Sequence, residues 1–351
     1  MQKGLATVAQ LGDYDDIIDA RTPAEYAQDH IPGARNLPAL GDEERVRVGT
    51  LYKQVSPFEA RKVGAVLVAR NVAAHVEAHC LDKPRSWRPL VYCWRGGKRS
   101  GAFTHVLREI GWDAARLDGG YKRWRAHVIE RLAALPGRMR FRVVSGATGS
   151  GKSRLLEALG RKGVPILHLE DLAAHKGSVL GSLPDRPQPS QKMFETRLCT
   201  ALEALARHPG REVYVEAESR RIGTLNLPDS LIAAIRAAPC LRVEATPAAR
   251  VAFLLGDYDY FLADPRWLIE RLAHLRGLQS NETVDRWRGM VESGDFPALV
   301  AELLEKHYDP LYERSQNRNY RDFAEGDRFA TDDLAPESIA ALADRVLAGR
   351  E

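Results

Sequence analysis

The chain has 351 residues, of which 44% are hydrophobic and 28% charged, and it carries a formal net charge of +4. This length exceeds what a single hydrophobic core usually serves, so we expect two domains, each with its own core. No apolar run is long enough to cross a bilayer and residues 1–10 do not resemble a signal peptide, so we expect a cytoplasmic protein with no membrane partner.

The four cysteines lie far apart and form no C-x-x-C pair; they are Cys80, Cys93, Cys199 and Cys240. That spacing argues against a zinc knuckle and against the disulfide framework of a secreted protein. The mildly basic charge is compatible with a polyanionic partner and equally with an arginine-rich composition. Charge alone therefore does not predict nucleic-acid binding.

We expect the first domain over residues 1–135. Residues 14–21 predict a short buried strand ending in a polar turn, and Pro23 then lies in the first turn of a helix. Residues 56–78 carry apolar positions at helical spacing. We interpret Cys80, at the end of that segment, as a packed residue and not a reactive one.

Cys93 lies in a different setting, because the apolar strand predicted over residues 89–93 stops at this cysteine. The loop that follows consists of Trp94, Arg95, Gly96, Gly97, Lys98 and Arg99, and Ser100 then begins a helix. Loop N–H groups, a helix N-terminus and three cations would all favour the thiolate over the thiol. We therefore interpret Cys93 as a catalytic nucleophile beside an anion site, served by Arg95 and Arg99. The alternative is a core cysteine at the end of a strand.

Several landmarks of this first domain, in this order, resemble those of rhodanese domains. They are Asp19–Arg21 with Glu25, residues 30–36, Cys93 with its loop, and residues 117–121 with Trp124. The resemblance implies a parallel-sheet α/β domain whose cysteine carries sulfur or selenium. The spacing here is C-x5-R, one residue longer than the commonest rhodanese loop, and this longer loop resembles the rhodanese-like phosphatases. A cysteine phosphatase is therefore an alternative for this domain.

A phosphate loop of the form G-x-x-x-x-G-K-[ST] follows the apolar strand predicted from Phe141 onwards. Its residues are Gly146, Thr148, Gly149, Ser150, Gly151, Lys152 and Ser153. Glycines let backbone N–H groups turn inward around an anion, lysine adds a mobile charge, and serine opens a helix whose dipole favours phosphate. The loop predicts that phosphate or diphosphate binds here, without saying which molecule carries it.

Residues 135–137 predict a hinge, and we expect a second domain over residues 138–351. Strands predicted at 164–169, 212–217 and 241–245 alternate with helices, which indicates a parallel sheet with its ligand at the carboxyl ends of the strands. Glu216 ends the second of these strands and Glu218 follows it, so either could hold a metal ion near Ser153. The alternative is that both carboxylates pair with Arg220 and Arg221.

A polar insertion at residues 175–195 is expected to be functional, because long loops at the ligand end of a sheet usually are. From about residue 265 the chain is predicted to be mostly helical. Aromatic residues and arginines recur there, which fits either RNA stacking or ordinary helix packing. They are Trp267, Arg286, Trp287, Arg288, Tyr308, Tyr312, Arg314, Arg318, Tyr320 and Arg321.

The fusion of these two domains resembles the tRNA 2-selenouridine synthase family over nearly the whole chain. Further matching segments are residues 175–178, 216–223, 257–258 and 308–312. The resemblance implies a transferase that acts on wobble-position 2-thiouridine in the anticodon stem-loop of tRNA. It implies geranyl diphosphate and selenophosphate as substrates, an enzyme that supplies selenophosphate as a partner, and no tightly bound cofactor. A magnesium requirement and the oligomeric state stay open.

We expect the phosphate loop to serve geranylation of the thiocarbonyl sulfur and Cys93 to serve its replacement by selenium. Two alternatives come from other classes of protein. One is a phosphate-loop kinase or ATPase, or a cysteine phosphatase, with a regulatory rhodanese-like domain. The other is a sulfur-relay adaptor without catalytic activity.

Overall fold

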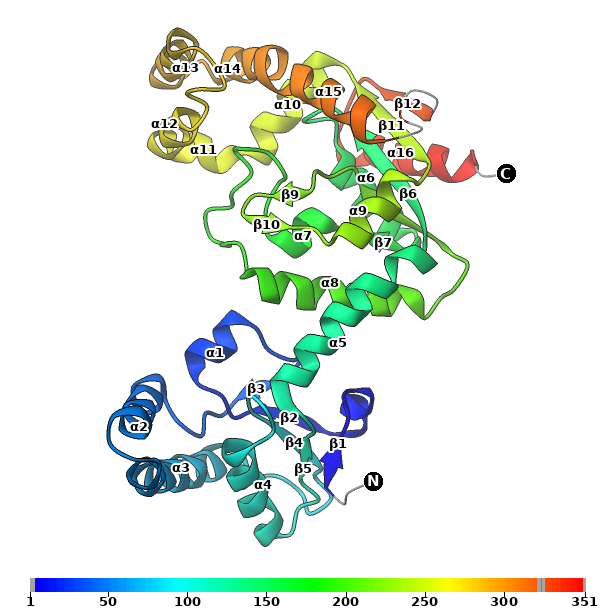
Figure 1. Ribbon diagram of the computed structural model, residues 1–351. Helices are drawn as coiled ribbons and strands as arrows, with labels where there is room; N and C mark the ends of the chain where they lie inside the picture. The colour runs from blue at the N-terminus through cyan, green and yellow to red at the C-terminus, as the bar shows by residue number, and fades with distance from the viewer. Residues whose placement is uncertain (1–3, 321–322, 324–325, 350–351) are drawn as a thin grey trace. The chain divides into compact units, whose positions relative to one another are not determined.

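The computed structural model describes residues 4–320, 323 and 326–349, without the side chains of residues 315–318. The chain divides into two compact units. Unit 1 comprises Met1–Arg131 together with Ser190–Thr200, and unit 2 comprises Leu132–Pro189 and Ala201–Glu351. The predicted architecture, two parallel-sheet α/β domains with helices towards the C-terminus, is confirmed (Figure 1). No helix within the described ranges is long and apolar enough to span a membrane.

Unit 1 contains a five-stranded parallel sheet with the order β1-β5-β4-β2-β3. Its strands are β1 (Leu5–Ala6), β2 (Asp16–Asp19), β3 (Arg35–Asn36), β4 (Pro89–Tyr92) and β5 (Ala115–Leu117). All four residues of β4 are buried, as expected for a central strand covered on both faces. Because the strands are parallel, the loops after β2, β4 and β5 lie at one edge of the sheet.

The helices of unit 1 begin where their sequences supply caps. They are η1 (Val8–Asp13), α1 (Pro23–Gln28), α2 (Asp42–Gln54), α3 (Pro57–His79), α4 (Lys98–Ile110) and α5 (Gly120–Ala134). Thr22 caps α1 by accepting a hydrogen bond from the Glu25 N–H, and Ser56 caps α3 in the same way. Cys80 ends α3 and is buried in the core of the unit, as predicted.

Unit 2 contains a second five-stranded parallel sheet with the order β12-β11-β6-β8-β7. Its strands are β6 (Arg140–Gly146), β7 (Ile166–Leu167), β8 (Glu212–Glu216), β11 (Cys240–Ala245) and β12 (Asp327–Thr331), and a separate hairpin pairs β9 (Arg221–Ile222) with β10 (Leu225–Asn226). Strand β12 lies in the region predicted to be mostly helical. Its charged, largely exposed residues give no strand pattern, and it is held by pairing with β11 at the sheet edge.

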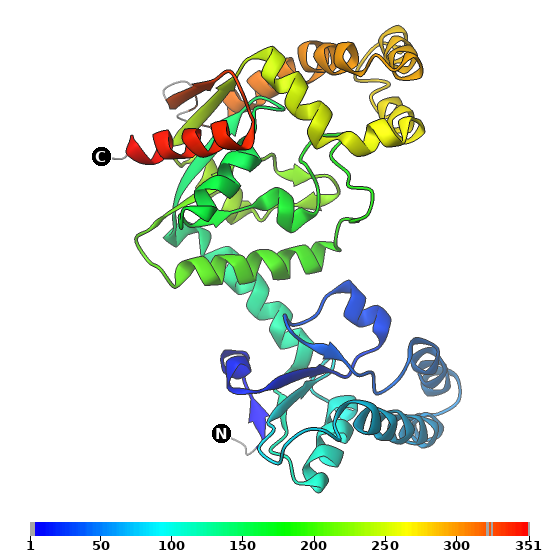
Figure 2. The ribbon, with the colours of Figure 1, turned by 180° about the vertical axis from the view of Figure 1, so that it is seen from behind.

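The helices of unit 2 cover both faces of this sheet and then form a helical layer. They are η2 (Pro136–Arg138), α6 (Lys152–Arg161), α7 (Leu169–Ala173), α9 (Asp229–Arg236), α10 (Pro247–Asp257), α11 (Asp259–Ala263), α12 (Pro265–Ala273), α13 (Asn281–Ser293), α14 (Phe296–Leu303), the π-helical segment η3 (Leu304–Tyr308), α15 (Asp309–Asn319) and α16 (Pro336–Ala348). Helix α8 (Gln191–Ala206) is divided between the units, because its residues up to Thr200 belong to unit 1. Helices α6 and α16 lie together on one face of the sheet, whereas α9 lies on the other (Figures 1 and 2).

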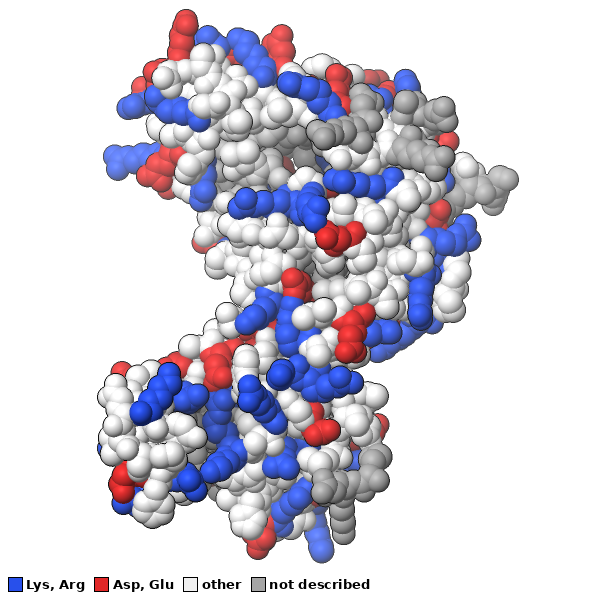
Figure 3. Space-filling model, viewed as in Figure 1, with Lys and Arg blue, Asp and Glu red and all other residues white. Residues whose placement is uncertain are grey.

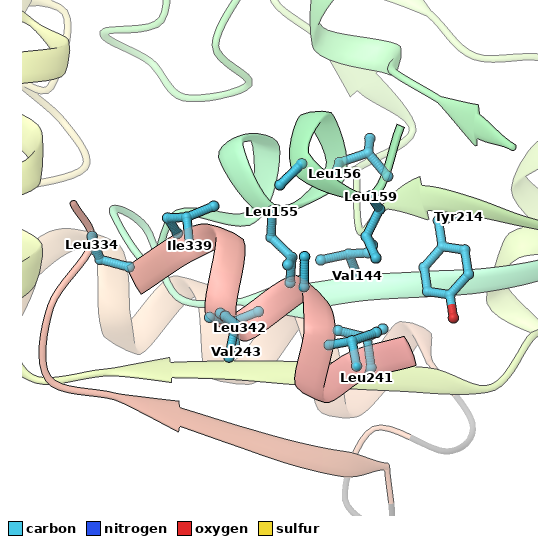
Figure 4. Close-up of a cluster of buried hydrophobic side chains, with 13 residues drawn as sticks. Val144, Leu155, Leu156, Leu159, Tyr214, Leu241, Val243, Leu334, Ile339 and Leu342 are labelled. Atoms are coloured by element: carbon cyan, nitrogen blue, oxygen red, sulfur yellow. The ribbon is translucent and has the colours of Figure 1, made fainter. Parts of the chain in front are cut away.

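The core between α6, α16 and the sheet fixes the start of α6. Leu155 and Leu159 from α6 pack against Val144 of β6, and Leu342 of α16 completes the cluster (Figure 4). Each of these side chains is essentially inaccessible to water, which corresponds to roughly 1.5–3 kcal/mol of burial free energy per residue. The phosphate loop therefore runs between two rigid elements, β6 and α6.

Candidate functional site

Cys93 lies at the carboxyl end of β4, where the sequence predicted it. The residue is 3% exposed, and its Sγ lies 3.2 Å from the Ser100 Oγ at the start of α4. The Tyr121 N–H donates to the Cys93 carbonyl (2.8 Å), and the Lys122 N–H donates to the Trp94 carbonyl (3.0 Å). These bonds from the first turn of α5 turn the carbonyls of the loop away from its interior.

Two glycines with positive φ let the cysteine loop approach α5 closely. Gly96 has φ +65° and Gly120 has φ +58°, and a Cβ on Gly120 would lie 2.2 Å from the Cys93 carbonyl oxygen. Within the described chain, the backbone N–H groups from Trp94 to Ser100 have no acceptor in the protein. Unpaired N–H groups beside a nucleophilic side chain form an anion site.

The predicted cations of this loop differ in their surroundings. The Arg99 Nη1 lies 2.6 Å from the Glu25 Oε2. Burial alone would raise the pKa of Glu25, but the hydrogen bond and charge of Arg99 lower it below the ordinary value. Arg95 and Lys98 are exposed and form no ion pair with any described residue. Arg99 thus fixes the loop to α1, whereas Arg95 and Lys98 are available to an incoming anion.

A buried polar layer lies beneath the cysteine loop, on the predicted motif Asp19–Arg21. The Arg21 guanidinium is 1% exposed, pairs with Asp19 (2.6 Å) and stacks on the Tyr121 ring at 3.9 Å. Tyr92 donates to Asp19 and Tyr121 donates to Asp29. Buried charges are tolerated only when they are paired and hydrogen-bonded, as they are here, so this layer holds β2, β4 and α5 in register.

The phosphate loop has the geometry that its sequence predicts. Gly149 and Gly151 have φ near +78°, and a Cβ on Gly149 would meet the Leu254 side chain at 2.8 Å. Among the described residues, the N–H groups of Thr148, Gly149, Gly151, Lys152 and Ser153 have no protein acceptor. The Gly146 N–H donates to the Tyr312 Oη (2.5 Å), and the Ser150 N–H bonds to Ala147 O, so these two are engaged within the protein.

A buried arginine supports this loop from outside. The Arg250 Nε donates to the Thr148 carbonyl (2.8 Å), and its two Nη atoms form a bidentate pair with Asp309 at 2.6 and 2.9 Å. Bidentate pairs fix geometry as well as contributing energy. The sequence did not single out Arg250, because a lone arginine in an apolar helix gives no signal of the loop it contacts.

Three glutamates and a histidine lie beside the loop. The Ser153 Oγ donates to the Glu170 Oε2 (2.7 Å), and the Glu216 carboxylate accepts from the Leu169 N–H (2.6 Å) and lies 2.6 Å from the His168 Nδ1. Burial, reinforced by neighbouring negative charge, raises the pKa of Glu170 and raises that of Glu218 well above its ordinary value.

The alternative in which Glu216 and Glu218 pair with the following arginines is wrong. Arg220 pairs instead with Asp229, and the Arg221 side chain donates to the Gly223 carbonyl. Glu216 is fully buried beside His168, so the two glutamates belong to the phosphate-loop site.

A cavity of about 560 Å³ opens over the phosphate loop. The predicted functional insertion supplies part of its wall through Lys176, Gly177 and Ser178. The Lys176 Nζ lies 2.8 Å from the Asp257 carboxylate and 4.4 Å from the centre of the Tyr258 ring. The cavity is therefore bordered by Lys152 and the acidic cluster on one side and by this insertion on the other.

A second, apolar cavity of about 70 Å³ adjoins the first. The two share wall residues from the loop, the insertion, the end of α10 and η3, which are Thr148, Ser178, Leu254, Tyr258 and Tyr308. The rest of its wall is almost entirely hydrocarbon and aromatic, from α11, α12 and α14, and includes Phe261, Leu268, Phe296, Leu299 and Leu303. An anion site thus continues into an apolar pocket within one unit.

Comparison with known proteins identifies both units. Residues 5–127 match the family model of the rhodanese-like domain, and residues 139–280 match that of the tRNA 2-selenouridine synthase AAA domain. The tRNA 2-selenouridine synthase of Aeromonas salmonicida (strain A449) is 33% identical over 355 residues, which cover 93% of this chain and 94% of that protein. The chain belongs to the tRNA 2-selenouridine synthase family. The synthase of Nitrosomonas europaea is 40% identical over 244 residues, 69% of this chain and 63% of that protein.

Among its described residues, the helical layer of this family member packs its two tryptophans against other side chains, which is not the exposed platform that RNA stacking requires. Trp287 is fully buried and donates to Glu302, and Trp267 packs 4.6 Å from the Phe261 ring. Arg286 pairs with Glu302 and Arg288 with Glu292. Helix packing is therefore the correct interpretation for these residues, whereas Arg321 and the side chain of Arg318 lie outside the described residues.

The acidic cluster fits a divalent cation. Mg²⁺ prefers oxygen ligands, and Ser153, Glu170 and Glu218 supply them. Burial, followed by the charge of neighbouring carboxylates, raises the pKa of both glutamates, and a bound cation would offset both effects. Sequence analysis proposed Glu216 or Glu218 for this place and missed Glu170, because that residue lies in the first turn of the short helix α7 with no motif around it.

Proposed function

We propose that this chain is a transferase that converts 2-thiouridine in tRNA to 2-selenouridine, first by geranylation of the sulfur and then by exchange for selenium. The observation that carries the proposal is the pairing of two different anion sites in one chain. One surrounds a cysteine, and the other is a phosphate loop that continues into an apolar pocket. The named relatives, which are 2-selenouridine synthases, support the overall reaction.

Geranyl diphosphate matches the composite cavity of unit 2. Its diphosphate would lie on the free N–H groups of Thr148–Ser153 and on Lys152, and its isoprenoid chain would enter the apolar pocket. In the reaction the thiocarbonyl sulfur bonds to C1 of the geranyl group as the C1–O bond breaks. Diphosphate leaves with the electron pair and the base loses its N3 proton. Donors aimed at a leaving group stabilise charge as it develops.

Mg²⁺, where bound by Ser153 and Glu170, would supply further charge neutralisation for the diphosphate. The protein contributes the fixed frame around it. Arg250 holds the loop through Thr148, and His168 pairs with Glu216. Glu218 lines the cavity, and in its ionised form it would accept the proton from the base.

Selenophosphate matches the cysteine site of unit 1. The free N–H groups of Trp94–Ser100, with Arg95 and Lys98, would bind its phosphate beside Cys93. The Cys93 thiolate forms a bond to C2 of the base as the bond from C2 to the geranylated sulfur breaks and geranylthiol leaves. Selenium then forms a bond to C2 as the bond from C2 to the Cys93 sulfur breaks and the thiolate is restored. Water cleaves the P–Se bond to release phosphate, and N3 regains a proton. No redox partner is needed, because selenium and sulfur keep their oxidation states.

The proposal is tested by mass spectrometry of tRNA after incubation with each substrate. Lys152→Ala is expected to prevent accumulation of geranylated tRNA, whereas Cys93→Ala is expected to accumulate it and to form no 2-selenouridine. Loss of geranylation in Cys93→Ala with selenation retained would reverse the assigned roles. Two results without any tRNA product would favour the alternatives. Steady hydrolysis of ATP would favour a kinase or ATPase, and Cys93-dependent hydrolysis of a small phosphate ester would favour a phosphatase.

A further inference from the structure

Trp94 is an exposed tryptophan directly beside the buried cysteine. Its side chain is 39% exposed, while those of Trp87, Trp112, Trp124 and Trp287 are buried. Large aromatic side chains gain free energy from burial, so an exposed indole is not explained by folding. Exposure next to a reactive residue indicates that the ring contacts a ligand.

The indole is held in place on its inner side. Its ring centre lies 5.4 Å from that of Tyr121, at an interplanar angle of 34°. Tyr121 is itself fixed, because its hydroxyl donates to Asp29 and its ring lies over Arg21. The backbone of Trp94 is fixed by the bond from Lys122. A ring that is already ordered loses little conformational entropy when a ligand stacks on it.

Exposed cations lie near Trp94 along its loop and on the adjoining helix. Arg95 and Lys98 lie on the same loop, Lys122 is bonded to the Trp94 carbonyl, and none of the three forms an ion pair with the described residues. Lys and Arg side chains gather on the face of unit 1 that carries α4 and α5 (Figure 3). An aromatic platform near unpaired cations is the arrangement that binds an unpaired base and its flanking phosphates.

We propose that Trp94 is the stacking platform for an unpaired nucleobase of the RNA substrate, and that Arg95, Lys98 and Lys122 bind the phosphates beside it. The stacked base would lie at the mouth of the Cys93 site, which positions its C2 substituent for exchange. Trp94 is thus a positioning residue. This inference rests on the proposed function, because it takes RNA to be the substrate of the cysteine site.

The test uses the full chain and a synthetic anticodon stem-loop RNA with 2-thiouridine at the wobble position. Trp94→Ala and Trp94→Leu are expected to weaken RNA binding by on the order of 10- to 100-fold, as loss of one base stack does, and to raise KM more than they lower kcat. Trp94→Phe keeps an aromatic face and should stay within a few-fold of wild type. Tyr52→Ala removes an even more exposed ring on α2 and should change nothing.

Two further measurements do not depend on the folding of a Trp94 variant. RNA should protect the exposed tryptophan of the wild-type chain from acrylamide quenching. Lys122→Gln should reduce the slope of log Kd against log salt by about 0.7, while Lys53→Gln, an exposed lysine of α2, leaves the slope unchanged.

The outcomes separate this inference from the proposed function. One outcome would overturn the stacking role of Trp94 alone. In it the wild-type chain binds the RNA and makes 2-selenouridine, but the RNA does not protect the tryptophan from quenching and Trp94→Leu binds the RNA as tightly as wild type. Wild-type chain that neither binds nor modifies the RNA would overturn both.

Discussion

The ion pair between His168 and Glu216 makes the stability of unit 2 depend on pH. Burial alone would lower the pKa of His168, but the hydrogen bond and charge of Glu216 raise it from 6.5 to about 9. Each pKa unit corresponds to about 1.4 kcal/mol, so the protonated imidazole contributes on the order of 3 kcal/mol to the folded state. Because the folded-state pKa is the higher one, this contribution is complete below pH 6.5 and is lost as the pH rises through 9.

His168→Gln removes the titrating charge and leaves a side chain of similar size. We expect it to lower the free energy of unfolding by about 3 kcal/mol at pH 6 and by much less at pH 10. Urea unfolding of both chains across this range measures the difference. An NMR titration of the imidazole, assigned by its absence from the variant, should have its midpoint near 9. His105→Gln, an exposed residue 3.8 Å from Glu109, is the control and should cost little. A difference between wild type and His168→Gln that does not vary with pH would refute the reasoning.

Three further substitutions test other parts of the two sites. Gly120→Ala places a Cβ 2.2 Å from the Cys93 carbonyl oxygen. Selenation measured by mass spectrometry should therefore fall at least tenfold, while geranylation persists. The control is Gly111→Ala, which is also at positive φ but in open space and should spare both reactions. Val300→Phe narrows the apolar cavity of about 70 Å³ and should raise KM for geranyl diphosphate about tenfold. It should not change inhibition by inorganic diphosphate, which has no apolar chain. Equal effects on both ligands would contradict the assigned pocket. Arg250→Lys loses the bidentate pair with Asp309 and should weaken diphosphate binding several-fold, as measured by calorimetry. An unchanged affinity would contradict the role of Arg250 in supporting the phosphate loop.

Local sequence signals predicted the elements that present each anion site. The apolar run before Cys93 and the run before Gly146 both ended as buried parallel strands, and the residues after each began a helix. These features depend on hydrophobic pattern and on glycines at fixed offsets, so one stretch of chain contains them. The strand pattern failed for β12, whose edge position leaves polar residues on both faces.

The supporting residues could not be predicted because they come from distant parts of the chain. Arg250 reaches Thr148 across 102 positions, and Tyr312 reaches Gly146 across 166. Neither contact follows a period or a motif. Burial of the tail aromatics was equally hidden, since a tryptophan that packs between helices and one that stacks on RNA have the same neighbours in sequence.

The surroundings of Glu170 favour the proposal that the acidic cluster serves the reaction as well as the fold. Its carboxylate accepts from Ser153, the last residue of the phosphate loop, and its pKa is raised by burial and by the charge of Glu216. Buried like charges destabilise a fold unless something compensates for them, and a hydrophobic residue in their place would cost less. The free-energy cost of burying these carboxylates beside Lys152 is best explained if they bind a cation or transfer a proton. Either role would serve a phosphate-bearing substrate in the adjoining cavity, as the proposed geranyl transfer needs.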